Sequence, residues 1–325
     1  MIRDITVTGN RQLGRLANGA VPSLILDAGN DAWRRYVEWL AANIRNRNTR
    51  EAYARAIRRF SNWCEQHKVG LKALSPFLVA AYIEQLGTEA SAPTVKQHLA
   101  AIRMLCDWLV VGQILPMNPA ASVRGPKHVV KRGKTPVLTP DQAKLLLDSI
   151  ETDTIVGLRD RALIATMIYS FARVSAVLGM NIEDHYADGK RWWIRLHEKG
   201  GKFHEVPAHH RLDEFLDVYL ASSRIGADRR SPLFRSVNRH RQLTERRLTR
   251  REALAMVQRR CRGLPLPEAV CCHSFRATGI TAYMLNGGTL EHAQQIAAHE
   301  SPRTTKLYDR TRDEITLDEI ERIVL

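Results

Sequence analysis

The spacing of hydrophobic residues predicts that roughly the first 110 residues form a bundle of helices. We expect the second helix to begin at Thr49 as its N-cap, because the apolar side chains beyond it fall three to four residues apart with arginines between them. The inward set is Tyr53, Ala56, Ile57, Phe60 and Cys64, and the outward set is Arg55, Arg58 and Arg59. Similar patterns predict helices over 31–44, 76–86 and 94–110. Residues 1–26, with several Gly and Asn, are expected to form an irregular arm.

A change of composition after residue 115 indicates a linker. Residues 116–136 hold four prolines, two glycines and five Lys or Arg. The prolines and glycines disfavour regular secondary structure, and the positive charges favour a segment that lies along a polyanion. A new helix should begin at Thr139, because Pro140 stands at its first position and Gln142 completes a capping box. The predicted division is an arm at 1–26, a helical domain at 27–115, a basic linker at 116–136, and a second domain at 137–325 with a tail at 309–325.

The second domain is expected to be mostly helical with one β-hairpin. Residues 191–197 are rich in aromatic side chains and alternate between apolar and polar, Gly200 and Gly201 supply a turn, and 203–206 complete the pair. The predicted fold class is therefore mainly α: a helical N-terminal domain followed by a mixed, mostly helical domain with a small hairpin or sheet.

The charge balance suggests a polyanionic partner, of which nucleic acid is the commonest. The chain has 49 Lys and Arg against 34 Asp and Glu, a formal net charge of +15. Thirteen arginines lie between residues 224 and 262, a density that favours phosphate and base-edge contacts, although a basic loop is the alternative. The basic outer sides of the N-terminal helices are consistent with the same partner, but each taken singly is more often a solvated surface.

Several classes of protein are disfavoured by the composition. No apolar run reaches the length of a membrane span, and the first residues lack the apolar stretch of a signal peptide. The five cysteines are an odd number without metal-ligand spacing, so we expect reduced thiols, no metal site and a cytoplasmic location.

Four short segments carry side chains that could act together in catalysis. Arg173 follows a hydrophobic helix, and Lys199 lies on the hairpin turn. Towards the C-terminus follow the histidines His273 and His299, the arginine Arg276 and the tyrosine Tyr308. Each has an ordinary explanation when taken alone: an ion pair, an exposed turn lysine, a helix cap, or a packed aromatic ring.

The order and spacing of these residues resemble the tyrosine recombinase (phage integrase) family, which includes the site-specific recombinases of phages and mobile elements. The resemblance covers nearly the whole chain and is densest over 273–309. It implies a helical core-binding (SAM-like) domain followed by the tyrosine recombinase catalytic fold. The catalytic residues that it implies are Arg173, Lys199, His273, Arg276, His299 and the nucleophile Tyr308.

Two positions depart from the family pattern. The residue three after the first arginine is commonly acidic in the family and is Ala176 here, and the residue before that arginine is often Gly and is Ala172 here. The acidic residue is a supporting group, so its absence affects how Arg173 or His273 is oriented rather than the class of reaction.

The resemblance implies cleavage of a phosphodiester by transesterification. Arg173 and Arg276 would hold the non-bridging oxygens, and Tyr308 would attack phosphorus to form a covalent 3′-phosphotyrosine. The tyrosine must lose its proton, for which His273 is the natural base. Lys199 would protonate the departing 5′ oxygen, and His299 would donate a hydrogen bond to a phosphate oxygen. The chemistry needs neither ATP nor a metal, and no cofactor is expected.

The partners that the resemblance implies are double-stranded DNA with paired recombination sites and three further copies of the chain, with accessory DNA-bending proteins as an option. Such a protein would be cytoplasmic and associated with the nucleoid. One alternative is a type IB topoisomerase, which relaxes DNA with similar residues. Another is a non-catalytic DNA-binding protein of the same fold, which we would expect to lack at least one of the six residues.

Overall fold

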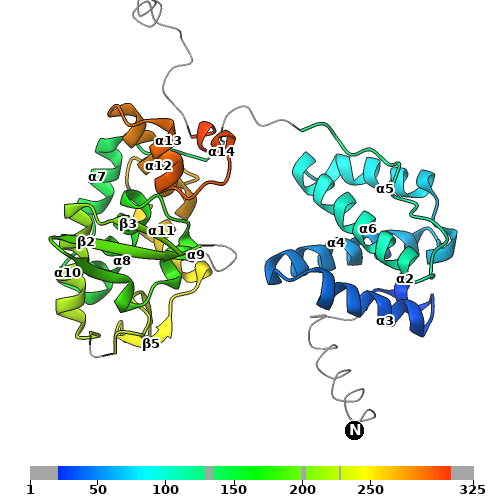
Figure 1. Cartoon of the computed structure of the whole chain (residues 1–325), viewed down its shortest axis with the longest axis horizontal. Coiled ribbons are helices and arrows are strands. Elements are labelled where there is room, and N and C mark those ends of the chain that lie inside the picture. Colours follow the sequence, from blue (N-terminus) through cyan, green and yellow to red (C-terminus); the bar gives the residue numbers. More distant parts are fainter. Residues whose placement is uncertain (1–20, 129–132, 134, 199–202, 227, 309–325) are drawn as a thin grey trace, which may run out of the picture. The chain divides into compact units, whose positions relative to one another are not determined.

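The computed structural model describes residues 21–128, 133, 135–198, 203–226 and 228–308 (Figure 1). The chain divides into two compact units, residues 1–129 and 130–325. In the part of the chain that the structure describes, no helix combines the length and apolar character needed to cross a membrane.

The N-terminal unit is entirely helical in its described part. Its elements are α2 (Ser23–Leu26), α3 (Asn30–Glu38), the π-helical turn η1 (Trp39–Asn43), α4 (Arg47–Gln66), the 3-10 turn η2 (Leu71–Ala73), α5 (Pro76–Glu89) and α6 (Ala92–Val111). The four helices expected from the spacing of apolar residues are therefore present, each with bounds a few residues from those predicted.

Two expectations for this unit were wrong. The N-cap of α4 is Asn46, whose side-chain oxygen accepts from the backbone N–H groups of Asn48 and Thr49, so the helix includes Thr49. Asn caps a helix at least as well as Thr and comes first along the chain. Of the segment expected to be an irregular arm, residues 1–20 lie outside the described residues, and the end of the segment is not irregular, because it forms the short helix α2 with Leu24 and Ile25 buried against the bundle.

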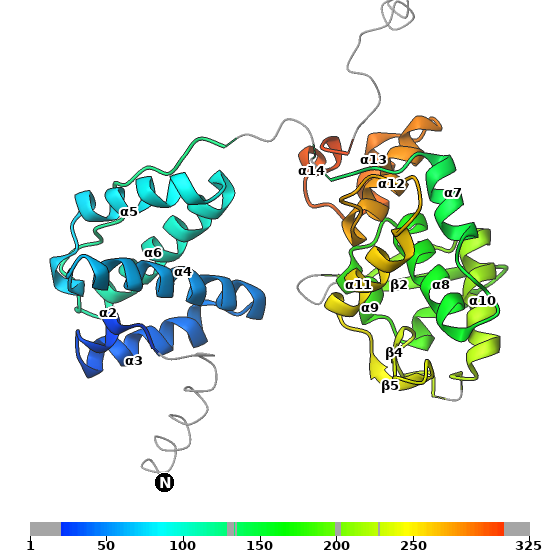
Figure 2. The same ribbon diagram turned by 180° about the vertical axis from the view of Figure 1, so that it is seen from behind.

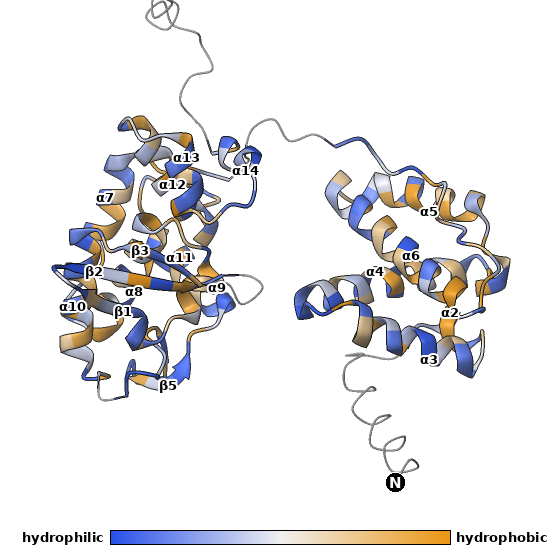
Figure 3. Cartoon of the chain, in the orientation of Figure 1, coloured by the Kyte–Doolittle hydropathy of each residue, from blue (hydrophilic) through white to orange (hydrophobic). Residues whose placement is uncertain are grey.

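The inward and outward positions of α4 follow the helical period. Ala56, Ile57, Phe60 and Cys64 of α4 are buried, as expected, while Tyr53 is partly buried. Figure 3 shows hydrophobic and hydrophilic stretches on the same helices in both units, which is the pattern of elements with one buried side.

The C-terminal unit is mostly helical and contains two small antiparallel sheets. Its helices are α7 (Pro140–Asp148), α8 (Ile155–Tyr169), α9 (Val174–Gly179), the 3-10 turn η3 (Ile182–Asp184), α10 (His210–Ser223), α11 (Arg250–Cys261), α12 (Cys272–Leu285), α13 (Leu290–Ile296) and α14 (Pro302–Lys306). The strands are β1 (His185–Asp188), β2 (Arg191–His197), β3 (Phe203–Pro207), β4 (Arg235–Val237) and β5 (Leu243–Arg247). The first sheet has the order β1-β2-β3, and the second pairs β4 with β5.

The expected hairpin and the expected helix start are both present. Strand β2 pairs with β3 so that His197 faces Phe203. Thr139 caps α7 by accepting from the N–H of Gln142, whose side chain accepts in return from the N–H of Thr139. The sequence pattern did not predict β1 or the β4–β5 pair. The expected C-terminal tail, 309–325, lies outside the described residues.

Helix α8 is central to the C-terminal unit and contacts α7, α9, α10 and α12. The approach of α12 to α8 is very close at Gly279, where a Cβ would overlap the backbone carbonyl oxygen of Ile168. Only a glycine permits this approach, which fixes α12 against the end of α8. Figures 1 and 2 show α12, α13 and α14 gathered at the upper end of this unit and the β4–β5 hairpin at its lower end.

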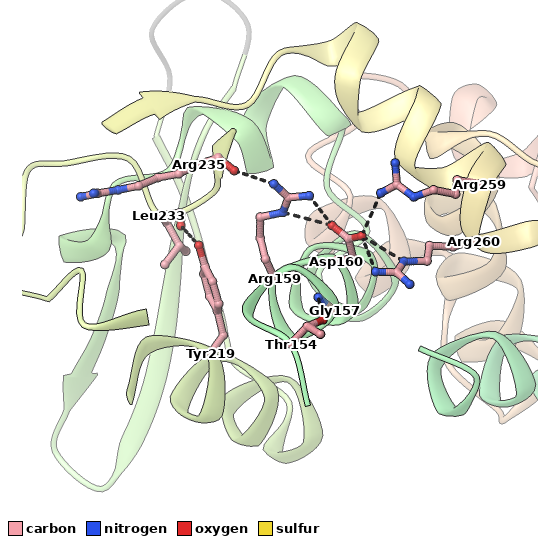
Figure 4. Close-up of polar contacts among 9 residues, drawn as sticks. All are labelled: Thr154, Gly157, Arg159, Asp160, Tyr219, Leu233, Arg235, Arg259 and Arg260. Carbon is pink, nitrogen blue, oxygen red and sulfur yellow. Dashed lines mark hydrogen bonds and ion pairs between the residues drawn. The ribbon is translucent and has the colours of Figure 1, made fainter. Parts of the chain in front are cut away.

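A buried carboxylate attaches α11 to α8 (Figure 4). Asp160 of α8 is fully buried and accepts from Arg159 at 2.6 Å, from Arg260 at 2.9 Å and from Arg259 at 3.3 Å. Arg159 also donates to the carbonyl of Arg235, which attaches strand β4. Removing one partner of a buried ion pair costs about 3–5 kcal/mol, so this cluster is a structural element of the unit.

Part of the arginine-rich segment 224–262 is therefore internal. Arg247 donates to the carbonyls of Leu178 and Met180 at 2.6 and 2.7 Å, and burial lowers its pKa. Together with Arg260, whose side chain is only 18% exposed, it shows that arginine density alone overestimates the number of side chains available to a polyanion.

Candidate active site

Five of the six candidate residues lie in the described part of the C-terminal unit. Arg173 directly precedes α9 and is its N-cap residue, while His273 and Arg276 belong to the beginning of α12. His299 lies between α13 and α14, and Tyr308 follows α14. Lys199 lies outside the described residues.

Arg276 holds together the two loops that carry other candidate residues. Its side chain is buried and donates from one terminal nitrogen to the carbonyl of Phe171 and from the other to the carbonyl of Ala297 at 2.6 Å. Phe171 is two residues before Arg173, and Ala297 is two residues before His299. One guanidinium on α12 therefore fixes the chain on either side of the site.

Arg276 also retains capacity to bind an anion. Its Nε is buried without a hydrogen-bond partner in the described residues, and each terminal nitrogen carries a second hydrogen. Burial, and secondly the charge of Arg173, lower the pKa of Arg276 to about 10, which still leaves it charged at neutral pH. A negative group placed between the two arginines would relieve this repulsion.

Phe171 adopts the left-handed backbone conformation, with φ at 52°. A bulky residue is rare there and the conformation costs on the order of 1–3 kcal/mol. The phenyl ring is buried beside Tyr283 in an edge-on contact, with the ring centroids 5.9 Å apart, and the carbonyl is held by Arg276. The strained turn directs the chain from α8 into Arg173.

The hydroxyl of Tyr308 lies 2.6 Å from Nε2 of His273. Burial lowers the pKa of His273, and the charges of Arg276 and Arg173 lower it further, so its imidazole is neutral at neutral pH and can accept a proton. Burial raises the pKa of Tyr308, while Arg276 and Arg173 oppose that rise. The pair has the geometry of a hydroxyl and its general base.

His299 packs against the ring of Tyr308. The two rings are nearly parallel, with centroids 5.7 Å apart, and Nδ1 of His299 lies 2.8 Å from the hydroxyl oxygen of Thr305. Burial and the charges of Arg276 and Arg173 lower the pKa of His299 to about 3. His299 is therefore neutral, and if Thr305 donates to Nδ1 the proton lies on Nε2, which can then donate to a ligand.

Arg173 has a carboxylate partner that the sequence reasoning missed. One terminal nitrogen of Arg173 lies 2.7 Å from an oxygen of Glu198, whose side chain is only 9% exposed, whereas that of Arg173 is 40% exposed. Glu198 follows strand β2 and stands directly before Lys199. Two features of the sequence could have indicated this partner. Glu198 lies in the predicted hairpin, and Ala176 stands where the family commonly has an acidic residue.

One group in the described residues could hold a metal ion, and it contains none of the candidate residues. It consists of His185, Asp213 and Asp217, whose ligand atoms lie within 4.8 Å of one another. His185 already bonds Asp213 at 2.9 Å. This cluster joins β1 to α10 and is not part of the arrangement around Tyr308.

Comparisons with known proteins match both units of the chain to one family. The model of the phage integrase family matches residues 136–314, and that of the phage integrase N-terminal SAM-like domain matches residues 33–112. The chain is 28% identical to the tyrosine recombinase XerC of Thermodesulfovibrio yellowstonii over 80% of its own length and 85% of that protein. It is 29% identical to XerC of Pelobacter propionicus over 80% and 84% of the two lengths.

Solved structures share the fold. The chain is similar to the XerH site-specific recombinase bound to a palindromic difH substrate, with a TM-score of 0.68, 19% identity, and coverage of 96% of this chain and 94% of that one. It is also similar to a lambda integrase tetramer bound to a Holliday junction, with a TM-score of 0.64, 17% identity, and coverage of 87% and 79%.

Proposed function

Since this chain belongs to the phage integrase family of tyrosine recombinases, we propose that it cleaves and rejoins double-stranded DNA at paired recombination sites through a covalent 3′-phosphotyrosine at Tyr308. The observation that carries the proposal is the 2.6 Å contact between the Tyr308 hydroxyl and the neutral His273, next to two arginines. A phosphodiester needs that combination of nucleophile, base and positive charge.

The proposed cleavage step balances as follows. The Tyr308 hydroxyl passes its proton to Nε2 of His273 as its oxygen bonds to phosphorus, and the bond from phosphorus to the 5′ oxygen breaks. Lys199 supplies a proton to the departing 5′ oxygen. The same steps in reverse, with a 5′ hydroxyl from a partner strand, rejoin the DNA and release the tyrosine.

Three further groups stabilise the charge that develops on the non-bridging oxygens. Arg173 and Arg276 supply positive charge, Arg276 through its unpartnered Nε and remaining hydrogens. A neutral His299 that accepts from Thr305 keeps a proton on Nε2 for a phosphate oxygen. Donors fixed in advance are effective because they need no rearrangement as the charge develops.

The proposal predicts a covalent protein–DNA adduct that can be mapped. Incubation with a nicked duplex that loses its 5′ hydroxyl fragment after cleavage should trap the protein on DNA, because the reverse step then lacks its nucleophile. Mass spectrometry of the digested adduct should place the phosphate on the peptide that contains Tyr308, with equal yield in the presence of a metal chelator. Adduct on another residue, or none with any candidate site, would contradict the proposal.

We also propose that the protein is cytoplasmic and associated with the nucleoid, and that its described N-terminal helices bind DNA. On two duplexes, four copies of the chain would act together. One structural relative, lambda integrase, is a tetramer when bound to a Holliday junction, which supports the assembly. Sedimentation of the full chain with two duplexes should give a tetramer, and truncation after residue 311 should lose it together with strand exchange. Relaxation of supercoiled DNA without any exchange would favour the topoisomerase alternative.

A further inference from the structure

The contact between Glu198 and Arg173 joins two segments that the proposed reaction needs. Glu198 comes directly after strand β2, at the start of the hairpin turn, while Arg173 precedes α9. The contact distance is 2.7 Å, and the carboxylate is 9% exposed. A nearly buried carboxylate requires a charged or hydrogen-bonding partner, so this ion pair is a fixed part of the site rather than a surface contact.

Helix α9 offers no carboxylate to Arg173 from the position where the family commonly has one. That position is Ala176, which is 1% exposed and packs in the hydrophobic core of the C-terminal unit. We propose that Glu198 supplies the missing support and is a positioning residue that orients Arg173 towards the scissile phosphate. The inference rests on the proposed function, because it assigns the orientation of a residue in that same site.

The ion pair leaves Arg173 able to bind a phosphate. Only one terminal nitrogen of Arg173 contacts Glu198. The Nε and the other terminal nitrogen of a guanidinium lie along a different edge of the plane, and the side chain is 40% exposed. A carboxylate on one edge fixes the plane and leaves a second edge for the ligand.

The charge of Glu198 also acts on the second arginine. Arg173 lowers the pKa of Arg276, both arginines lower the pKa of the neighbouring His273, and Glu198 opposes the fall in the pKa of Arg276. Without DNA, Glu198 is a counter-charge that allows two guanidiniums to lie close together. Loss of its charge should therefore misplace Arg173, the more exposed of the two.

Three variants test the assignment. Glu198→Ala removes the contact, and Glu198→Gln keeps a hydrogen-bond acceptor but removes the charge. The matched control is Glu205→Gln, because Glu205 lies on β3 of the same hairpin and pairs with Arg195 at 2.8 Å instead of with Arg173. All three are assayed as the full chain, at saturating protein, by the rate of adduct formation in a single turnover.

We expect Glu198→Ala to slow adduct formation about a hundred-fold, because misplacing a catalytic group by about 1 Å has an effect of that order. Glu198→Gln should slow it less, and Glu205→Gln should match the unmodified protein. Affinity for DNA should be the same in all four proteins, and the rates are compared at a temperature where each protein remains folded. Equal rates for Glu198→Ala and Glu205→Gln would overturn the inference. Adduct formation by the unmodified protein in the same experiment would still leave the proposed function intact.

A modified substrate separates orientation of Arg173 from general support of the fold. A methylphosphonate at the scissile position has no negative non-bridging oxygen, so it depends less on a correctly aimed guanidinium. The loss caused by Glu198→Ala should shrink to within about three-fold on this substrate if the residue acts through Arg173. An unchanged hundred-fold loss would show a merely structural role and overturn the assignment.

A second modified substrate examines the neighbouring lysine. A duplex with sulfur as the bridging 5′ atom releases a thiolate, which needs no proton from Lys199. The loss caused by Glu198→Ala should persist on this duplex. If sulfur restores the rate, Glu198 acts by positioning Lys199, and the assignment to Arg173 is wrong.

Discussion

Replacing Tyr308 with Phe is expected to abolish the covalent adduct while leaving DNA binding and the fold unchanged. The phenyl ring fills the same space among Phe171, Ala277 and Ile280, so the substitution removes little except the hydroxyl that contacts His273. Loss of a nucleophile lowers the rate by at least about 10⁴-fold in enzymes of known mechanism. The measurement is adduct yield on the nicked duplex beside a binding isotherm at the same salt concentration.

A matched control for this substitution is Tyr283→Phe. Tyr283 packs against the same cluster, so its replacement removes a second hydroxyl from the neighbourhood of the site. We expect its adduct yield to equal that of the unmodified protein. Adduct formation by Tyr308→Phe at an appreciable rate would show that another residue is the nucleophile.

Replacing Arg276 is expected to damage both the reaction and the stability of the C-terminal unit. In Arg276→Ala, the carbonyls of Phe171 and Ala297 lose their donors, at a cost of about 1–3 kcal/mol each when they remain buried. The reaction loses a preorganised positive charge, which is worth about 10²–10³-fold in rate. Arg276→Lys should rescue little, because an ammonium cannot reproduce the two-pronged contact.

These two effects are measured separately. Denaturant unfolding gives the loss of stability, and single-turnover adduct formation gives the loss of rate under conditions where each variant remains folded. Arg303→Ala is the control for stability, because Arg303 is exposed on α14 and its loss should change the free energy of unfolding by less than about 0.5 kcal/mol. Full stability of Arg276→Ala would contradict the structural role assigned to its side chain.

Local patterns in the sequence predicted most of the helices because they depend on nearby residues. The start of α7 rests on Thr139, Pro140 and Gln142, which stand at the N-cap, the first helical position and the capping-box position. The same reasoning failed at α2, since four residues contain too little pattern to reveal a helix that owes its order to burial of Leu24 and Ile25. Strand β1 was missed although its signal is local, because it pairs with β2 across a two-residue turn in which Gly189 holds the first position with φ at 60°.

The candidate residues were identified by their order along the chain, whereas their contacts depend on the tertiary fold. The pairing of Tyr308 with His273 joins residues 35 positions apart, and that of Arg173 with Glu198 joins residues 25 apart. No local period encodes either distance. The two backbone carbonyls that Arg276 binds could not be predicted either, because side-chain types do not show which backbone groups come close in the fold. The catalytic role of Arg276 stays a prediction.

The contact of Arg276 with the carbonyls of Phe171 and Ala297 has a consequence for how such a protein can lose its activity in evolution. A lineage that no longer needs DNA cleavage can exchange Tyr308 for Phe by one substitution and still inherit a folded protein, because only a hydroxyl is lost. A lineage that loses Arg276 inherits two loops without their common donor and a less stable product. Inactive descendants that survive as binding proteins should therefore carry a changed tyrosine far more often than a changed second arginine.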